Sequence, residues 1–507
     1  MISRIVVSTG LVAGLMASVP SGAQAETDNF ALAVQQLPGI VDNAMQRTGV
    51  PGVAVAVVHN DQVIYSQGFG VRSAKDSEPV TTDTVFQLAS VSKPIGASVV
   101  AASVGDKDLK WTDPITKFLP TFELSNGYVT RNVTVADMYS HRSGLPGSVG
   151  NDLEGFGFGR KAIIKRMRYE PLSPFRVSYS YSNFGMTVGG EAAAEAADTT
   201  WPKLARKQIF GPLGMDKTSY RYKDFIKQSN RAALHQKIDG QWVPAVKRDA
   251  DAQAPAGGAS STVADMAQWL RMQLANGVYN GERVVKKGPL QEARSIQIRN
   301  LPATDDASMV GGYALGLDTR SSASGNVHWT HSGAFTSGAA TTILMIPALN
   351  TGIVVLTNTW PIGVPESIAA SYAQIVETGA LTTDWLSVIG PAFAPFTTPN
   401  NTVDGKPKPA KPKPASALKT YTGTYTNDYV GDVKIVKDGK KLTMRIGPNL
   451  ETTVPFFHWT ANQFGYTYID MPKGFTAGAI FSKIKGGKAQ RLYLDEVGPD
   501  VGVLTRT

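Results

Sequence analysis

Ser90 and Lys93 stand three residues apart in the chain, and a hydroxyl and an amine at this spacing could carry out acyl transfer. Residues three apart on a helix share one face, so the lysine amine can lie within hydrogen-bonding distance of the serine hydroxyl. A serine hydroxyl becomes a strong nucleophile only when a base removes its proton, and a desolvated lysine with a lowered pKa can be that base. The pair therefore predicts a reaction through an acyl-serine intermediate.

The Ser-x-x-Lys spacing also arises by chance, and it recurs at Ser482–Lys485. That second copy lies in an alternating, lysine-rich segment that is typical of an exposed strand. The first copy follows an apolar run and precedes a helix of small residues, with Pro94 in the first turn, where proline is tolerated. Taken alone, Ser90 could equally be a helix cap without chemistry.

Tyr181 and Asn183 provide a second candidate group. They lie two residues apart in a short predicted turn and are expected to point the same way. Tyr181 could hold or relay the proton between Ser90, Lys93 and the leaving group. Asn183 could orient the lysine or hold a substrate amide. The same spacing recurs at Tyr425–Asn427, where a strand end followed by a turn explains it.

A third candidate group is the run from His331 to Ala334, which lies in a strand-rich region. Gly333 would let a substrate backbone approach the edge of a strand closely. The backbone N–H groups of Ser90 and Ala334 could together form an oxyanion hole. For His331 itself, a buried structural histidine is the alternative.

The elements that must position these residues are predicted from hydrophobic periodicity. They alternate between helices and strands, and a Gly- and Pro-rich helical region separates the first hairpin from the later strands. We therefore expect an α/β (α+β) fold, with an antiparallel sheet flanked by helices and a helical subdomain. The predicted elements are helices over 30–48 and 365–378, a hairpin over 53–58 and 62–68, and strands over 327–330, 341–345 and 353–356.

The end of the chain has a different character. Residues 396–417 contain Lys–Pro repeats, which predict a stiff, extended linker. Residues 418–507 alternate apolar and polar side chains between Gly, Asp and Asn turns, which predicts a small all-β, barrel-like domain. This domain could pack beside the candidate site or partly gate it. The aromatic, glycine-rich run over 155–159 predicts either a plain loop or a mobile lid with aromatic tips.

The first 25 residues are typical of a signal peptide. Arg4 supplies a positive start, residues 5–17 form an apolar stretch too short to stay in a bilayer, and Ala23–Ala25 is a small-x-small cleavage site. We predict cleavage after Ala25 and a periplasmic or secreted protein, with an uncleaved anchor as the alternative. No later apolar run reaches about 18 residues, so no integral membrane span is expected.

Composition excludes several classes of site. The chain has no cysteine, which rules out disulfides, a cysteine nucleophile and thiolate metal ligands, and its six histidines show no metal-binding spacing. We therefore expect neither a metal nor a cofactor. The net charge of +9 is concentrated beyond residue 400, where 16 Lys and Arg face 9 Asp and Glu. No nucleic-acid partner is expected, and the sequence makes no prediction about oligomeric state.

Taken together, the three groups resemble the serine β-lactamase and penicillin-binding protein superfamily, specifically its class C and D-aminopeptidase/esterase branch (peptidase family S12 type). The resemblance covers about residues 30–380. Further turns that resemble the family are His141–Pro146, Pro212–Met215 and Pro255–Met266. The family's fold implies that the groups meet in one cleft, and that His141 is structural. The roles implied are catalytic for Ser90 (nucleophile), Lys93 and Tyr181 (proton transfer), and substrate-binding or oxyanion-stabilising for Asn183, His331, Gly333 and Ala334.

One departure from the family pattern is informative. Most β-lactamases and DD-peptidases have a lysine where this chain has His331, and that lysine presents a fixed positive charge to a substrate carboxylate. Histidine is mostly neutral at pH 7, and losing a charge-assisted hydrogen bond costs about 1.5–3 kcal/mol. The resemblance therefore implies an esterase, amidase or peptidase. Arg160 and Arg176 are candidates for replacing the charge.

The overall prediction is an exported serine hydrolase that cleaves amide or ester bonds of small peptides or carboxylic esters through acyl-Ser90. A β-lactamase or DD-carboxypeptidase is one alternative. A penicillin- or peptidoglycan-binding sensor or scaffold without turnover is another. The predicted organisation is a signal peptide over 1–25, a β-lactamase-like domain over 26–395, a linker over 396–417 and an all-β domain over 418–507.

Overall fold

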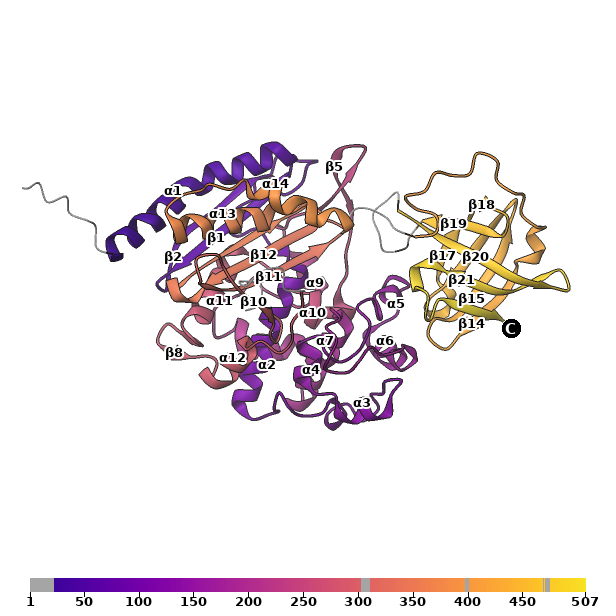
Figure 1. Cartoon of the computed structure of the whole chain (residues 1–507), viewed down its shortest axis with the longest axis horizontal. Helices are drawn as coiled ribbons and strands as arrows, with labels where there is room; N and C mark the ends of the chain where they lie inside the picture. The colour runs from indigo at the N-terminus through magenta and orange to yellow at the C-terminus, as the bar shows by residue number, and fades with distance from the viewer. Residues whose placement is uncertain (1–21, 302–310, 397–400, 468, 470–474) are drawn as a thin grey trace, which may run out of the picture.

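The computed structural model describes residues 22–301, 311–396, 401–467, 469 and 475–507. Within these ranges a seven-stranded sheet with helices on both faces forms the main body, and a nine-stranded sheet forms a second domain beside it (Figure 1). No helix in the described part of the chain has both the length and the hydropathy that crossing a bilayer requires. Residues 1–21 of the predicted signal peptide lie outside the described residues, and cleavage after Ala25 stays a prediction.

The main sheet is antiparallel throughout, in the order β2-β1-β13-β12-β11-β10-β9. This confirms the predicted fold class. Asn60 and Asp61 join the first hairpin and both have positive φ, as a tight hairpin turn requires. The strands are β1 (Gly52–His59), β2 (Gln62–Gly70), β9 (Gly312–Tyr313), β10 (Asp318–Ser321), β11 (Val327–Phe335), β12 (Ala339–Ile346) and β13 (Thr351–Thr357).

Helices cover both faces of this sheet, and its central strands β1, β12 and β13 are mostly apolar and buried at nearly every position. The odd-numbered valines of β1 share a core with α1 and α13, whereas the even-numbered residues share a core with α2 and α11. Alternate side chains of a strand point to opposite faces, so a continuous apolar run needs a cover on each side. The four helices are α1 (Gly22–Thr48), α2 (Ser92–Asp106), α11 (Val263–Leu274) and α13 (Val364–Thr378).

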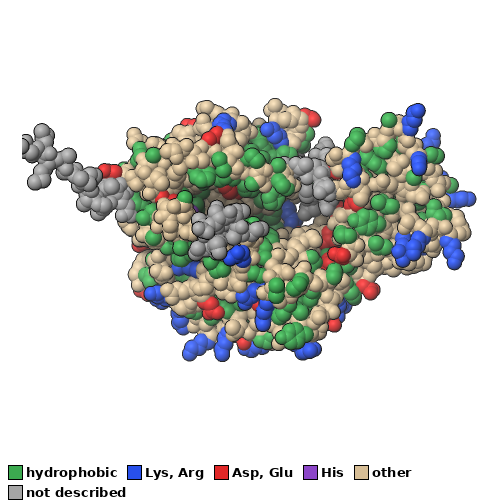
Figure 2. Space-filling model, viewed as in Figure 1, with side chains coloured by type: hydrophobic (Ala, Val, Ile, Leu, Met, Phe, Trp, Pro, Cys, Tyr) green, Lys and Arg blue, Asp and Glu red, His purple; other side chains and the backbone are tan. Residues whose placement is uncertain are grey.

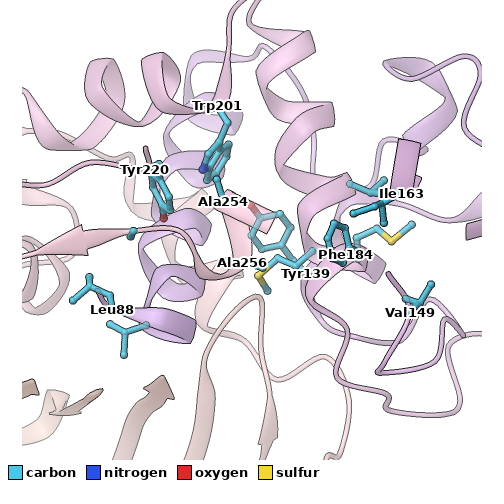
Figure 3. Close-up of a cluster of buried hydrophobic side chains, with 14 of the residues drawn as sticks. Leu88, Tyr139, Val149, Ile163, Phe184, Trp201, Tyr220, Ala254 and Ala256 are labelled. Carbon is cyan, nitrogen blue, oxygen red and sulfur yellow. The ribbon is translucent and has the colours of Figure 1, made fainter. Parts of the chain in front are cut away.

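Shorter helices and strands complete the main body. Tyr139, Phe184 and Trp201 pack together with the short helix α10 in a buried apolar cluster (Figure 3). A Cβ on Gly190 of α7 would lie 2.6 Å from Pro255, so glycine allows α10 to pack directly on α7. The helices are α3 (Gly127–Asn132), α4 (Val135–Tyr139), α5 (Asn151–Gly155), α6 (Arg160–Arg166), α7 (Asn183–Ala196), α8 (Trp201–Ala205), α9 (Tyr222–Lys227), α10 (Ala254–Gly257), α12 (Lys287–Arg294) and α14 (Trp385–Ile389), and the strands are β3 (Phe86–Gln87), β4 (Leu234–Ile238), β5 (Gln241–Val246), β6 (Ser260–Ser261), β7 (Val278–Tyr279) and β8 (Glu282–Arg283).

Asp137 ties helix α4 to the loops that surround it. It forms a capping box with Thr134, and its buried carboxylate pairs with Arg142 (Nε–Oδ1, 2.7 Å) and Arg176 (Nη2–Oδ2, 2.8 Å). Burial alone would raise the pKa of Asp137, but the hydrogen bonds from Arg176, Thr134 and Arg142 outweigh it and hold the pKa below its ordinary value. The ionised carboxylate therefore stabilises this part of the fold.

The substitution Asp137→Asn is expected to lower the free energy of unfolding at pH 7 by about 2–3 kcal/mol, because it removes the buried carboxylate that pairs with Arg142 and Arg176. Urea unfolding measures this, with the exposed Asp216, which pairs with Arg206, as the control. Asp216→Asn should cost less than about 1 kcal/mol. Because the pKa of Asp137 is lower in the folded state, the effect should be present above about pH 4 and shrink below it. Equal losses in both variants would contradict the prediction.

The second domain is a nearly closed, barrel-like antiparallel sheet in the order β17-β16-β15-β14-β22-β21-β20-β19-β18. The predicted all-β domain is therefore present, and Tyr421, Phe464 and Phe481 pack in its interior. Lys and Arg side chains are prominent on its outer side (Figure 2). Its strands are β14 (Gly423–Asn427), β15 (Gly431–Asp438), β16 (Lys441–Ile446), β17 (Thr452–Pro455), β18 (Phe457–Thr460), β19 (Gln463–Thr467), β20 (Thr476–Lys485), β21 (Lys488–Leu494) and β22 (Val503–Arg506).

The described part of the predicted linker contacts this barrel. The Thr402 hydroxyl donates to Asp495 (2.6 Å), and the Lys413 carbonyl accepts a hydrogen bond from the backbone N–H of Ala461 (2.7 Å). Residues 401–413 therefore run along the barrel at these points rather than standing free as a spacer. The second Ser-x-x-Lys copy forms the exposed end of β20, as its alternating pattern predicts.

Candidate active site

Ser90 lies in a short 3₁₀ turn, Ala89–Val91, directly before α2. Ala89 has a φ of 46°, a left-handed conformation that non-glycine residues adopt at a cost of about 1–2 kcal/mol. The turn is held by Ser92, whose hydroxyl donates to the Ala89 carbonyl (2.6 Å) and accepts from the Ala259 N–H (2.9 Å). Strained turns of this kind concentrate at functional sites. Here the turn sets Ser90 one helical turn ahead of the lysine.

Lys93 is completely buried, and its Nζ has three hydrogen-bond partners. They are Ser90 Oγ at 2.9 Å, Asn183 Oδ1 at 2.8 Å and the Ala256 carbonyl oxygen at 3.0 Å. Burial holds the pKa of Lys93 well below its ordinary value. The structure therefore favours a neutral amine at this position.

These three partners determine where the amine's lone pair points. A neutral amine has two N–H donors and one lone pair, and the two oxygens of Asn183 and Ala256 can only accept. The two donors of Lys93 are therefore taken by these oxygens, and the lone pair faces the Ser90 hydroxyl. A base aimed at its nucleophile in this way is the arrangement that proton removal requires.

Tyr181 lies on the other side of the same pair. Its ring centroid is 4.5 Å from Lys93 Nζ. Burial raises the pKa of Tyr181 well above the ordinary value for a phenol, although a hydrogen bond with the Ser90 side chain acts in the opposite direction. The phenol therefore keeps its proton and can pass one on only in exchange for another. The structure thus brings Ser90, Lys93, Tyr181 and Asn183 into one cluster.

His141 supports the turn that carries Tyr181 and Asn183. Its Nδ1 accepts a hydrogen bond from the Ser182 N–H (3.1 Å), and its ring lies 4.5 Å from that of Tyr181. Burial is the main cause that holds the pKa of His141 well below its ordinary value. The ring is therefore a neutral, buried support, which agrees with its expected structural role.

His331 is also buried, and both of its ring nitrogens have partners. Nδ1 lies 2.7 Å from the Ser332 carbonyl oxygen, which can only accept, so Nδ1 carries the proton. Nε2 therefore accepts a hydrogen bond from the Tyr313 hydroxyl (3.0 Å). Burial lowers the pKa of His331 to about 3, so the ring is neutral. Because neither nitrogen is left over, we assign the ring to holding Tyr313 rather than to direct contact with a substrate.

Gly333 lies where strand β11 passes the nucleophile turn. The ladder between β10 and β11 ends at Thr330, which leaves the next residues of β11 without a strand on that side in the described structure. A Cβ on Gly333 would lie 2.2 Å from the Leu88 carbonyl oxygen and 2.8 Å from the Ser90 backbone nitrogen. The nucleophile turn itself therefore requires glycine here, and the approach of a substrate backbone at Gly333 stays a prediction. Gly333 thus lies against the Ser90 amide, and Ala334 is the next residue along the strand.

The two arginines considered as replacements for the family's lysine are already paired. Arg160 binds Glu191, and Arg176 binds Asp137. A third arginine that the sequence did not single out, Arg248, stacks on Phe335 with its guanidinium carbon 5.2 Å from the ring centroid and pairs with Glu154. Its position next to Ala334 depends on contacts between distant segments, which no local pattern indicates.

Comparison with known proteins gives matches over most of the chain. The family model described as Beta-lactamase matches residues 37–377, and a model described as Domain of unknown function (DUF3471) matches residues 407–504. "Unguisins hydrolase ungD'" of Aspergillus campestris is 27% identical over 348 residues, which cover 64% of this chain and 61% of that protein. "Unguisins hydrolase ungD" of Aspergillus violaceofuscus is 25% identical, with 78% and 76% covered.

Two further proteins are similar to this chain. "Beta-lactamase-like protein 2" of Dictyostelium discoideum is 27% identical over 48% of this chain and 46% of its own length. The chain thus spans less than two thirds of the length of that protein and of ungD'. Among solved structures, an octameric penicillin-binding protein homologue from Pyrococcus abyssi shares the fold, with a TM-score of 0.60 and 21% identity over 93% of this chain and 100% of that one.

Proposed function

The chain belongs to the beta-lactamase family of hydrolases, and on that premise we propose that it cleaves ester or amide bonds of small peptides or carboxylic esters through an acyl-Ser90 intermediate. The observation that carries this proposal is the geometry of Lys93, whose lone pair faces Ser90 Oγ at 2.9 Å while its two donors are held elsewhere. The names of two relatives, which describe hydrolases, support a hydrolase.

In the proposed reaction, Lys93 takes the proton of Ser90 as Oγ attacks the substrate carbonyl carbon. The amides of Ser90 and Ala334 bind the oxyanion that forms. Tyr181 donates a proton to the leaving group as it departs. Lys93 then passes to Tyr181 the proton that it took from Ser90. A water molecule then attacks the acyl carbon while Lys93 takes a proton from the water. The bond between that carbon and Ser90 Oγ breaks, Lys93 returns the proton to Oγ, and the acid product leaves.

The surroundings of His331 favour esters and peptides over β-lactams. A neutral ring with both nitrogens engaged offers no positive charge to a substrate carboxylate. Arg248, near the end of β11, is paired with Glu154, so its charge is already compensated. A carboxylate-bearing substrate would therefore lose the ion pair that most of the family provides.

A panel of substrates tests the proposal on the purified full chain. We expect kcat/KM for a nitrophenyl ester or a short peptide amide to exceed that for a chromogenic cephalosporin by about tenfold or more. Fast cephalosporin turnover would identify a β-lactamase instead. A stable adduct on Ser90 without turnover, seen by intact mass, would identify a penicillin-binding sensor. Either of these two results would show that the proposed function is wrong.

Export to the periplasm or the medium is part of the same proposal. It rests on the positive start, short apolar stretch and small-x-small site of residues 1–25. A serine hydrolase outside the cytoplasm would meet small peptides and esters from the surroundings of the cell.

A further inference from the structure

Helix α5 lies between the C-terminal barrel and the candidate active site (Figure 1). On the barrel side, Tyr429 reaches across to the start of this helix and is only 2% exposed. Its hydroxyl accepts a hydrogen bond from the Gly150 N–H (2.9 Å) and donates one to Asp152 Oδ1 (2.8 Å). Gly150 and Asp152 are the residues immediately before and after Asn151. Tyr429 therefore fixes the backbone on both sides of Asn151.

The rest of this interface is closely packed. The Thr452 hydroxyl donates to the Phe156 carbonyl (3.3 Å), and a Cβ on Gly447 would lie 2.1 Å from that same oxygen. Phe156 and Phe158 are buried, so they are not the aromatic tips of a lid. Buried apolar side chains of the barrel and of the main body form one continuous cluster. Elsewhere the surface is hollowed between the two (Figure 2).

On the other side of α5, Asn151 touches the hydrogen-bond network of Lys93. The Asn183 Nδ2 donates to Asn151 Oδ1 (3.3 Å), while Asn183 Oδ1 accepts from Lys93 Nζ (2.8 Å). The acceptor at Asn151 therefore decides which end of the Asn183 amide faces the lysine. If that amide turned over, its N–H would occupy the lysine lone pair, and a lysine N–H would then point at Ser90.

We propose that Asn151 is a positioning residue for Lys93, and that the C-terminal domain, through Tyr429, holds Asn151 in place. This inference rests on the proposed function. The barrel then takes part in the reaction without contacting the substrate, because it fixes the amide that aims the base. The barrel's contact with α5 is thus more than packing beside the site.

Helix α5 also reaches the lysine by a second path. Glu154 accepts a hydrogen bond from Gln253, which immediately precedes α10 and its Ala256 carbonyl. Both acceptors that hold the Lys93 donors are therefore connected to the same short helix. A displacement of α5 would disturb both at once, whereas loss of the Asn151 acceptor alone would disturb only one.

Two substitutions of Asn151 distinguish the effect of its hydrogen-bond acceptor from the effect of its side-chain size. Asn151→Leu keeps the size but removes the acceptor, and Asn151→Asp keeps an acceptor. At pH 8, the Leu variant should lose about tenfold in kcat for a nitrophenyl ester with little change in KM, and the Asp variant should stay within about threefold of wild type. Equal losses in both variants, or no loss in either, would overturn the proposal.

Substitutions in the barrel test whether Tyr429 holds Asn151 in place. Tyr429→Phe should lower kcat about three- to tenfold, and adding it to Asn151→Leu should cause little further loss, because the two act on one path. The matched control is Tyr425→Phe, which removes a buried hydroxyl bonded to Tyr421 and Ala489 inside the barrel. It should leave kcat unchanged even where its melting temperature falls. Wild-type kcat in Tyr429→Phe, or additive losses, would overturn the proposal.

A second readout keeps this inference distinct from the proposed function. A fluorophosphonate reports the reactivity of Ser90 by intact mass, without any substrate. No labelling of Ser90 in the wild type would contradict the proposed function itself. Labelling of wild type, Asn151→Leu and Tyr429→Phe at equal rates would overturn only the positioning role. Slower labelling in both variants, with the Tyr425→Phe control at the wild-type rate, is the expected result.

Discussion

Replacing Ser90 with alanine is expected to lower kcat for ester hydrolysis by a factor of about 10⁴ or more, because residues that act as one nucleophilic unit fail together when the nucleophile is lost. The remaining groups can still bind the substrate and polarise its carbonyl, so KM should change far less than kcat. Steady-state kinetics on a nitrophenyl ester measures both, and intact mass should show no acyl adduct on the variant.

The chain offers a matched control for this experiment. Ser482 has the same Ser-x-x-Lys spacing but lies at the exposed end of β20 in the barrel, outside the cluster that Ser90 forms with Lys93 and Asn183. Ser482→Ala should keep the full wild-type rate. The prediction fails if the Ser90 variant retains more than about a tenth of the wild-type kcat, or if both variants lose activity alike.

Local patterns predicted much of the candidate site. Ser90 and Lys93 meet because the chain enters a helix between them, and Tyr181 and Asn183 lie on one turn at the start of α7. Those arrangements depend only on neighbours in the sequence. The convergence of the two pairs in one cluster came from the family resemblance, since no spacing within the chain determines it.

Other parts of the site left no local signal. The Ala256 carbonyl that holds Lys93 is backbone, which any residue could supply, and Asn151 reaches Asn183 across 32 positions of sequence. Tyr313, which fixes His331, stands in a two-residue strand. Such contacts arise from tertiary packing, and a single sequence does not display them.

In the fold, too, features set by local sequence were predicted and features set by distant contacts were not. The hairpin of β1 and β2 was predicted because its apolar run and its Asn-Asp turn are both local. Strand β11 was predicted only to Thr330, yet it continues to Phe335. Its second half, His331 to Phe335, lacks the β-branched residues of a typical strand and lies against the nucleophile turn, so contact with that turn sets its composition.

Replacing Lys93 with methionine is expected to lower kcat/KM by about 10³, the middle of the range for a positioned general base. Methionine has a similar length, but it provides no lone pair for the Ser90 proton and no donors for Asn183 or Ala256. Circular dichroism and a melting curve would show whether the variant is folded. A folded variant within about tenfold of the wild-type kcat/KM would mean that another group is the base.

The pH dependence of the wild type gives this prediction its second test. Burial lowers the pKa of Lys93, so the amine is neutral above that pKa and protonated below it. Protonation uses up the lone pair, and activity should therefore be lost as the pH falls through the lysine's pKa. Burial disfavours the charged forms of the two facing histidines, His141 and His331, so both rings are expected to stay neutral. The acid limb of kcat/KM should therefore disappear in Lys93→Met, and its persistence there would show that Lys93 is not the base.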